Sequence, residues 1–115
     1  LELAPPSLDE LLDRPADEAG SDARERILRV RAARELAEGR QGHPNATLDT
    51  RGLDEHAPLD RPMRDLVARA AERAALSARA VQSLRRVART LADLDGVELP
   101  TRRHLAEALS LRAEL

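Results

Sequence analysis

One short motif combines residue types that could bind an anion, Leu76-Ser77-Ala78-Arg79-Ala80. Ser77 is a favoured N-cap residue, and Arg79 follows it in the first turn of the helix that such a cap would start. The free amides and the dipole at a helix start attract anions, and a planar guanidinium can hold two phosphate oxygens. The spacing therefore makes Arg79 a candidate phosphate-binding residue. A solvated surface arginine would show the same pattern.

The other residues whose side chains could take part in catalysis or binding are better explained by structural roles. His43, His56 and His104 are far apart, and none pairs with another ligand at helical spacing, which favours surface or capping roles over metal binding. Four hydroxyl residues each stand just before an expected helix and are interpreted as caps: Ser7, Ser21, Ser77 and Thr101. Carboxylate pairs such as Asp54-Glu55 and Asp93/Asp95 are interpreted as solvated charges. We therefore expect no catalytic residue and no metal site in this chain.

The composition excludes several classes of function. All 19 basic residues are arginine, so a P-loop lysine and a Schiff-base lysine are impossible. No cysteine is present, which excludes disulfides and thiolate chemistry and fits a reducing compartment, so we expect a cytoplasmic protein. The absence of aromatic residues removes base-stacking platforms, and no apolar run is long enough to span a membrane.

Charge is distributed unevenly along the chain. Residues 1–60 contain 8 arginines and 14 acidic residues, whereas residues 61–115 contain 11 arginines and 7 acidic residues. The basic half could contact a DNA backbone, and such contacts would weaken steeply with salt. The candidate residues are Arg79, Arg85, Arg86, Arg89, Arg102 and Arg103. Solvated helix faces are the alternative interpretation.

The elements that would position these residues are helices. A long helix is expected from Ser21 to Gly39, followed by a loop over residues 40–58 with a helical turn near Leu53. Asp60 and Ser77 should cap the next two helices, with Gly96 ending the second, and Pro100-Thr101 should start a last helix. The apolar positions at helical spacing include Met63, Leu66, Val67, Val81, Leu84, Ala88, Leu91, Leu105 and Leu109. The fold class is therefore all-α, a small helical bundle.

The N-terminal residues have a different pattern. Residues 1–6 alternate apolar and polar side chains and stop at two prolines, which indicates the end of a strand. Ser7 and Glu10 form a possible capping box with Leu8, Leu11 and Leu12 behind them, which indicates a short helix. Residues 14–20 contain Pro and Gly and are interpreted as a linker.

Several motifs of the chain resemble one known family. The run 76–80, the stretch Arg86-Val87-Ala88-Arg89-Thr90-Leu91-Ala92-Asp93-Leu94 and the stretch 104–109, His-Leu-Ala-Glu-Ala-Leu, closely resemble the C-terminal domain of magnesium-chelatase-like AAA+ ATPases of the YifB/ComM group. Residues 24–34 are similar to the "R-x-R-V-x-x-A-R" helix of that family, and residues 45–48 match its "N-A-x-L" signature. The resemblance covers almost the whole chain.

The resemblance implies a helical lid that follows an ATP-binding core. Residues 1–13 would be a remnant of the core strand and exit helix, 14–20 a linker and 21–115 the lid. The "L-S-x-R" start of the third lid helix resembles the sensor-2 motif, so Arg79 would reach the γ-phosphate of ATP. ATP and Mg²⁺ would bind the parent protein, whose modules resemble ring hexamers, and neighbouring subunits and the core would be its partners. The ComM branch is associated with DNA branch migration.

The chain departs from a complete ATPase. It contains no Walker A, Walker B or sensor-1 segment, so we expect it neither to hydrolyse ATP nor to bind it tightly without the core. The remaining matched residues are interpreted as core positions without a catalytic role. The competing hypothesis is a non-enzymatic helical module that binds nucleic acid or protein.

Overall fold

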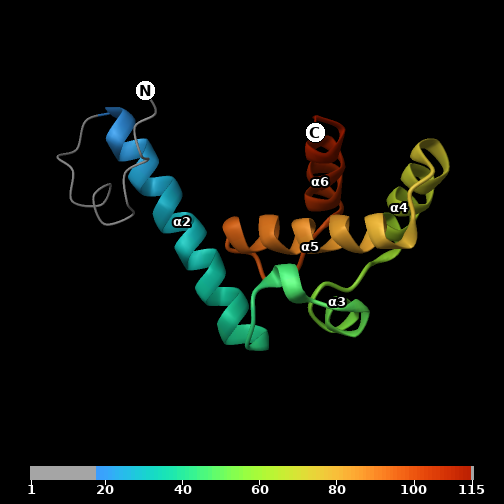
Figure 1. Cartoon of the computed structure of the whole chain (residues 1–115), viewed down its shortest axis with the longest axis horizontal. Helices are drawn as coiled ribbons and strands as arrows, with labels where there is room; N and C mark the ends of the chain where they lie inside the picture. The colour runs from blue at the N-terminus through green and yellow to red at the C-terminus, as the bar shows by residue number, and fades with distance from the viewer. Residues whose placement is uncertain (1–17, 115) are drawn as a thin grey trace, which may run out of the picture.

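The computed structural model describes residues 18–114, with side chains for residues 22–113. Every regular element in this range is helical, which confirms the expected all-α fold (Figure 1). The elements are α2 (Glu18–Gln41), η1 (Asn45–Thr47), α3 (Thr50–His56), α4 (Arg61–Ala74), α5 (Ala78–Leu94) and α6 (Arg102–Glu114). The expected strand at residues 1–6 and the short helix after Ser7 lie outside the described residues. No helix within that range is long and apolar enough to cross a membrane.

Helix α5 is the centre of the domain. It packs against α2, η1, α3 and α6, while α4 packs against α6. Figure 1 shows α5 running across the middle of the molecule, with α2 crossing at one end and α6 rising from it. Its buried apolar residues recur at every fourth position, and three of them are alanine, which allows neighbouring elements to approach closely. They are Ala80, Leu84, Ala88 and Ala92.

The core consists of two apolar clusters. One joins Met63, Ala88 and Leu105, with Leu59, Leu66 and Val67 packed against it, and so connects α4, α5 and α6. The other joins Leu48, Leu53 and Ala57 beneath α3. Of the core positions expected from the sequence, Leu84, Ala88 and Leu105 are fully buried, whereas Val81, Leu91 and Leu109 are half-buried.

The helix starts follow the expected capping chemistry. The Asp60 carboxylate accepts a hydrogen bond from the Met63 amide at 2.9 Å, and the Ser77 hydroxyl accepts one from the Ala80 amide at 3.1 Å. Gly96 has a φ of 70°, the left-handed conformation that ends α5. The predicted caps at Asp60 and Ser77 and the predicted end of α5 at Gly96 are therefore confirmed.

Helix α2 is longer at both ends than its sequence suggests. It begins at Glu18, so Ser21 lies inside the helix instead of capping it, and the last three residues of the expected linker are helical. It also passes through Gly39, and the chain turns only at Gly42, whose φ is 86°. The last turn is kept helical by Arg40, which reaches Asp93 on α5. The predicted boundaries at Ser21 and Gly39 were both wrong. At the C-terminal end, the contact of Arg40 with Asp93 overrides the local signal of Gly39.

The segment that was expected to be a loop holds two short helices. The helical turn predicted near Leu53 is confirmed as the seven-residue helix α3, which Asp49 caps by accepting from the Gly52 amide at 2.8 Å. Residues 45–47 form the 3₁₀ helix η1. Both elements lie against α5, so this segment is part of the folded domain.

Candidate functional site

The candidate phosphate-binding residue lies at the start of α5. Ala75 adopts a left-handed conformation (φ 49°) that ends α4, and two residues later Ser77 caps α5. Arg79 is the second residue of that 17-residue helix. Its side chain is exposed, and it forms no hydrogen bond or ion pair with any part of the chain that the structure describes. Arg79 is therefore free to bind a ligand at the tip of the turn between α4 and α5.

The next arginines of α5 have a different role, because they bind the end of α3. Arg85 donates to the Ala57 carbonyl at 3.2 Å and to the Asp54 carboxylate at 3.0 Å. Arg89 donates to the His56 carbonyl at 2.7 Å, and its side chain is 1% exposed. These carbonyls are at the negative end of the α3 dipole, where cations are favourable. Arg85 and Arg89, two of the arginines considered for DNA contact, thus direct their charge inward.

Arg86 binds the chain on the other side of α3, before that helix begins. Its Nε atom donates to the Leu48 carbonyl at 2.7 Å, and its side chain is half-buried. Together, Arg85, Arg86 and Arg89 hold the chain before and after α3 against one face of α5. The basic stretch that resembles the family motif is a structural clamp at these three positions.

Asp93 is the centre of a buried polar network. Its two carboxylate oxygens accept hydrogen bonds from Arg89 at 2.9 Å, from Arg40 at 2.8 and 3.1 Å, and from the Asn45 amide at 2.8 Å. Asn45 in turn accepts from Arg40 and Gln41, both at 2.9 Å. The network ties the end of α2 and η1 to α5.

The charges of this network shift its pKa values. Burial alone would raise the pKa of Asp93, but the hydrogen bonds from Arg40 and Asn45, together with the charge of Arg89, outweigh burial and lower it. Burial lowers the pKa of Arg89, and the attraction of Asp93 opposes that effect. Asp93 is therefore an ionised carboxylate with a side chain 1% exposed.

The interpretation of Asp93 as a solvated charge was wrong. Two of its partners, Arg40 and Asn45, come from segments about 50 positions earlier in the chain, and no local pattern indicates them. One signal was present: Arg89 and Asp93 are four residues apart on the apolar face of α5, the spacing of a helical ion pair. Arg40 and Asn45, which complete the site, were not identified as its members from the sequence.

His104 forms the cap of α6. Its Nδ1 atom accepts a hydrogen bond from the Thr101 amide at 2.9 Å, as the third residue of a capping box does. Because Nδ1 accepts, Nε2 carries the proton and donates to Asp95 at 2.8 Å. The hydrogen bond from His104 lowers the pKa of Asp95, and Arg103 adds to that effect. The predicted capping role of His104 is confirmed, but the side chain is buried and not at the surface.

The remaining exposed arginines include a group between α4 and α6. Arg61, Arg69 and Arg102 line a hollow of about 250 Å³ together with Asp65. None of the three arginines forms an ion pair with the residues that the structure describes. Within the same range, no three histidine or acidic residues are arranged to hold a metal ion.

Comparisons with known proteins match most of this chain to one family of domains. A family model described as magnesium chelatase, subunit ChlI C-terminal, matches residues 19–112. Competence protein ComM of Haemophilus influenzae is 34% identical over 96 residues, which cover 84% of this chain and 18% of ComM. The uncharacterized protein YifB of Escherichia coli K12 is 41% identical over 85 residues, 74% of this chain and 17% of YifB. The chain thus spans less than a fifth of the length of these curated relatives.

Proposed function

The chain belongs to the family of magnesium chelatase subunit ChlI C-terminal domains, and from this premise we propose that it is the helical lid of an ATP-driven motor. In this proposal, Arg79 contacts the γ-phosphate of ATP held by a preceding core domain, and the whole motor acts on DNA. Core and neighbouring subunits of a ring are the partners of the lid.

The proposal rests on one observation, the unpaired position of Arg79 in the first turn of α5. Arginine in the first turn of a helix is unfavourable for that helix by about 0.3–1 kcal/mol, because both the side chain and the helix end are positive. Arg79 occupies this position with no partner in the described domain, although its neighbours on α5 are paired. A phosphate group at this point would be held by the guanidinium and favoured by the dipole.

The geometry of the lid suits a residue that must be positioned accurately. Helix α5 is fastened to α3 by Arg85 and Arg89, and to α2 by Asp93. Arg79 therefore lies on a helix that would move together with the rest of the lid. ATP supplies the phosphoryl group and Mg²⁺ neutralises its charge when bound. The described residues provide one phosphate-binding group and no cluster of metal ligands, so we assign Mg²⁺ to the core.

The proposal is tested by Arg79→Ala in the full-length protein. We expect ATP turnover to fall roughly 10- to 1000-fold, the range over which loss of one transition-state contact acts. Arg112→Ala, which removes another exposed helical arginine that forms no hydrogen bond or ion pair with the described residues, is the matched control and should retain turnover. Equal turnover of the Arg79→Ala variant and the control would refute the assignment.

One observation favours a second function, contact with DNA. The hollow between α4 and α6 brings Arg61, Arg69 and Arg102 together around a single carboxylate, Asp65. A phosphodiester backbone would complement this excess of positive charge. Arg103 is adjacent but forms an ion pair with Asp95 at 3.1 Å.

The test of DNA contact is fluorescence anisotropy of a labelled duplex at several salt concentrations. Arg102→Ala should weaken binding uniformly across sequences and reduce the salt dependence by about one phosphate contact. Arg51→Ala, at an exposed position on α3, is the control. Binding that is absent at low salt, or equally strong in the two variants, would exclude the α4–α6 hollow as a DNA site.

A further inference from the structure

Helix α2 has an apolar face that stays exposed in the described domain. Ala33 and Ala37 are buried, whereas Leu28 and Leu36 are 48% and 50% exposed and Ala32 is exposed as well. At 3.6 residues per turn, Leu28, Ala32 and Leu36 form one line that lies about 120° around the helix from the two buried alanines. We call this line of three residues the α2 stripe.

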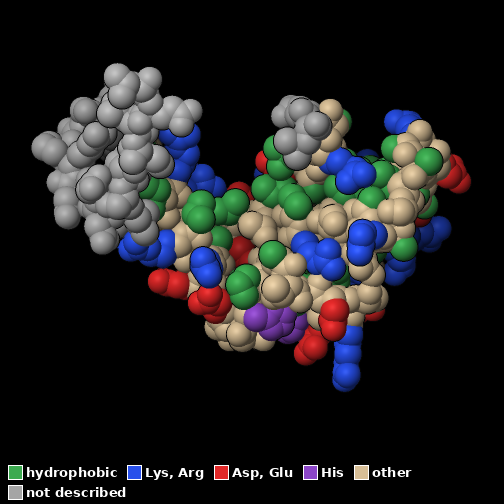
Figure 2. All heavy atoms as spheres, viewed as in Figure 1, with side chains coloured by type: hydrophobic (Ala, Val, Ile, Leu, Met, Phe, Trp, Pro, Cys, Tyr) green, Lys and Arg blue, Asp and Glu red, His purple; other side chains and the backbone are tan. Residues whose placement is uncertain are grey.

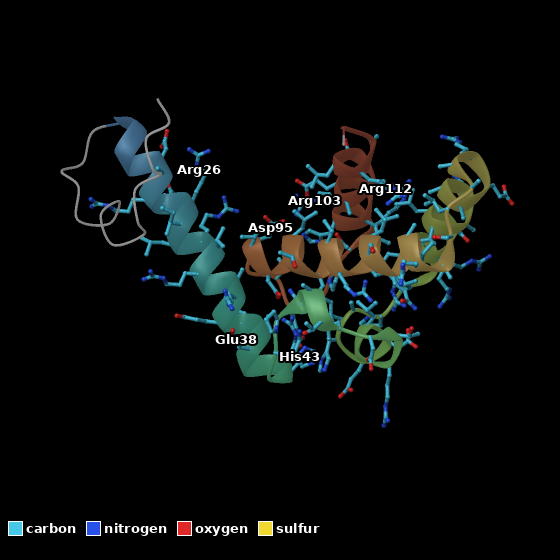
Figure 3. All side chains as sticks on the ribbon, viewed as in Figure 1. Arg26, Glu38, His43, Asp95, Arg103 and Arg112 are labelled. Atoms are coloured by element: carbon cyan, nitrogen blue, oxygen red, sulfur yellow. The ribbon has the colours of Figure 1, made fainter. Side chains whose placement is uncertain are left out.

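The arrangement of the helices leaves the α2 stripe accessible. Figure 1 shows that α2 crosses α5 near one end and extends beyond it, and Figure 2 shows hydrophobic and charged side chains at the surface along α2. Arg26 lies on the same side of α2 as Ala33 and Ala37, and Figure 3 shows it projecting on the side of α5 and α6. The α2 stripe is therefore turned away from the helix on which α2 packs.

The C-terminal half of the α2 stripe borders a hollow. Ala32, Glu35, Leu36, Gly39 and Arg40 line this shallow hollow of about 630 Å³. Ala32 and Gly39 are small, and a Cβ added at Gly39 would meet nothing within 4 Å. Small residues beside a leucine are typical of the holes that receive a side chain from a second helix. A large apolar side chain of another helix would therefore fit next to Leu36.

We propose that two copies of the chain pair through their α2 stripes in antiparallel orientation, with the two-fold axis at Ala32. In such a pair, each residue lies opposite the residue that is equally far from Ala32 in the other direction. Leu28 of one copy then enters the hollow beside Leu36 of the other, and the two Ala32 residues meet at the axis. The same surface serves both copies, as a two-fold interface requires.

The charges beside the α2 stripe also match in this orientation. Arg31 and Glu35 lie on the same side of the stripe, and neither forms an ion pair with the residues that the structure describes. In the antiparallel pair, Arg31 of each copy comes within roughly 3 Å along the axis of Glu35 of the other. Two ion pairs can therefore form. In a parallel pair, the side that carries Arg31 would instead face the side that carries Arg29, and like charges would meet.

The pairing does not depend on Arg79 or on ATP. Neighbours in a ring make head-to-tail contacts, whereas this contact is two-fold, so the α2 stripe would bind a copy that is not a ring neighbour. The contact area is small, because each copy contributes three apolar side chains at its centre. We therefore expect a dimer that forms in the micromolar range.

Cysteine cross-linking tests the pairing directly, because the chain contains no cysteine. In the full chain, Ala32→Cys places one thiol of each copy at the axis, so a disulfide-linked species of twice the mass should form. Val30→Cys is the matched control, because Val30 is also exposed but lies about 200° around the helix from Ala32. We expect Ala32→Cys to cross-link roughly tenfold faster or more. Equal rates would overturn the proposal.

The antiparallel orientation is tested with two further single-cysteine variants. A Leu28→Cys chain is mixed with a Leu36→Cys chain that carries an affinity tag, and the disulfides are identified after oxidation. The antiparallel pair predicts disulfides between the two variants. Disulfides that form only within each variant would indicate a parallel pair and would overturn the proposed arrangement.

Sedimentation velocity gives an independent test without cross-linking. The natural chain should sediment as a dimer at roughly 100 µM, whereas Ala32→Glu should be monomeric with an unchanged helical circular dichroism spectrum. Arg31→Glu should weaken the dimer roughly three- to tenfold, and adding Glu35→Arg should restore it. A natural chain that stays monomeric would mean that a different molecule covers the α2 stripe and would overturn the proposal. A failure of Arg79→Ala to affect turnover would leave these results unchanged.

Discussion

At the residue scale, the domain uses arginine in two opposite ways. Arg89 is fully buried and supplies hydrogen bonds to three backbone carbonyls and one carboxylate. Arg79, ten residues earlier on the same helix, is exposed and unpaired within the described domain. Lysine could not replace Arg89, because a single ammonium group lacks the planar fork that reaches several acceptors at once. The role of an arginine in this chain is therefore set by its neighbours and not by its charge.

The Asp93 network predicts a strong stability effect at one residue. Asp93→Ala leaves the buried Arg89 without its carboxylate partner, and we expect a loss of about 3–5 kcal/mol in the free energy of unfolding. Urea unfolding followed by circular dichroism measures it. Asp65→Ala, which removes an exposed carboxylate without an ion pair in the described range, should change stability by less than about 0.5 kcal/mol. A similar small effect for both variants would contradict the importance of the network.

The contact between Asp95 and His104 predicts that the stability of the domain depends on pH. The hydrogen bond from His104 holds the pKa of Asp95 below its ordinary value of 3.8. A carboxylate whose pKa is lowered by folding stabilises the native state at higher pH, and this contribution is lost as pH falls through the folded value. The stability difference between the natural protein and Asp95→Asn should therefore be constant above about pH 5 and shrink below about pH 4.

Thermal unfolding of the two proteins at a series of pH values measures this difference. The natural protein and the variant share Asp93 and every other carboxylate, so those contributions cancel in the comparison. A difference that stayed constant down to about pH 2 would contradict the described bond between Asp95 and His104.

At the scale of elements, the end of α2 gives a matched pair of predictions. Gly39 lies within the helix, and a Cβ added there would meet nothing within 4 Å. Gly39→Ala should therefore stabilise the domain by about 0.5–1 kcal/mol. Gly42 has a φ of 86°, so Gly42→Ala should destabilise the domain by about 1 kcal/mol or more. Chemical denaturation measures both, and effects of the same sign would contradict the helix end described for α2.

The parts of the fold that could be predicted from the sequence are those that depend on local contacts. The caps at Asp60 and Ser77 are local, because the side chain and the amide it binds are three residues apart, and both were predicted correctly. The end of α2 depends on the contact of Arg40 with Asp93, 53 positions away, and the prediction failed there. The position of Arg79 was predicted because it follows from a cap, whereas the burial of Arg89 follows from packing.

At the scale of the whole molecule, the polar network and the cap of α6 make α5 the helix on which the domain is assembled. Arg40, Asn45 and Asp93 join α2 and η1 to α5, and Asp95 joins the end of α5 to His104 in α6. The exposed start of α5 is then left to present Arg79 outward. These connections suit the proposed role of a lid, which would move as one unit against a core domain.

The central claim is that Arg79 contacts the γ-phosphate, and nucleotide affinity tests it most directly. Affinities for ATP and for ADP should be measured in the full-length protein and in its Arg79→Ala variant. The account predicts that the variant binds ATP roughly tenfold or more weakly while its affinity for ADP is nearly unchanged, since only ATP carries the contacted group. Equal losses for both nucleotides, or no loss for either, would contradict it.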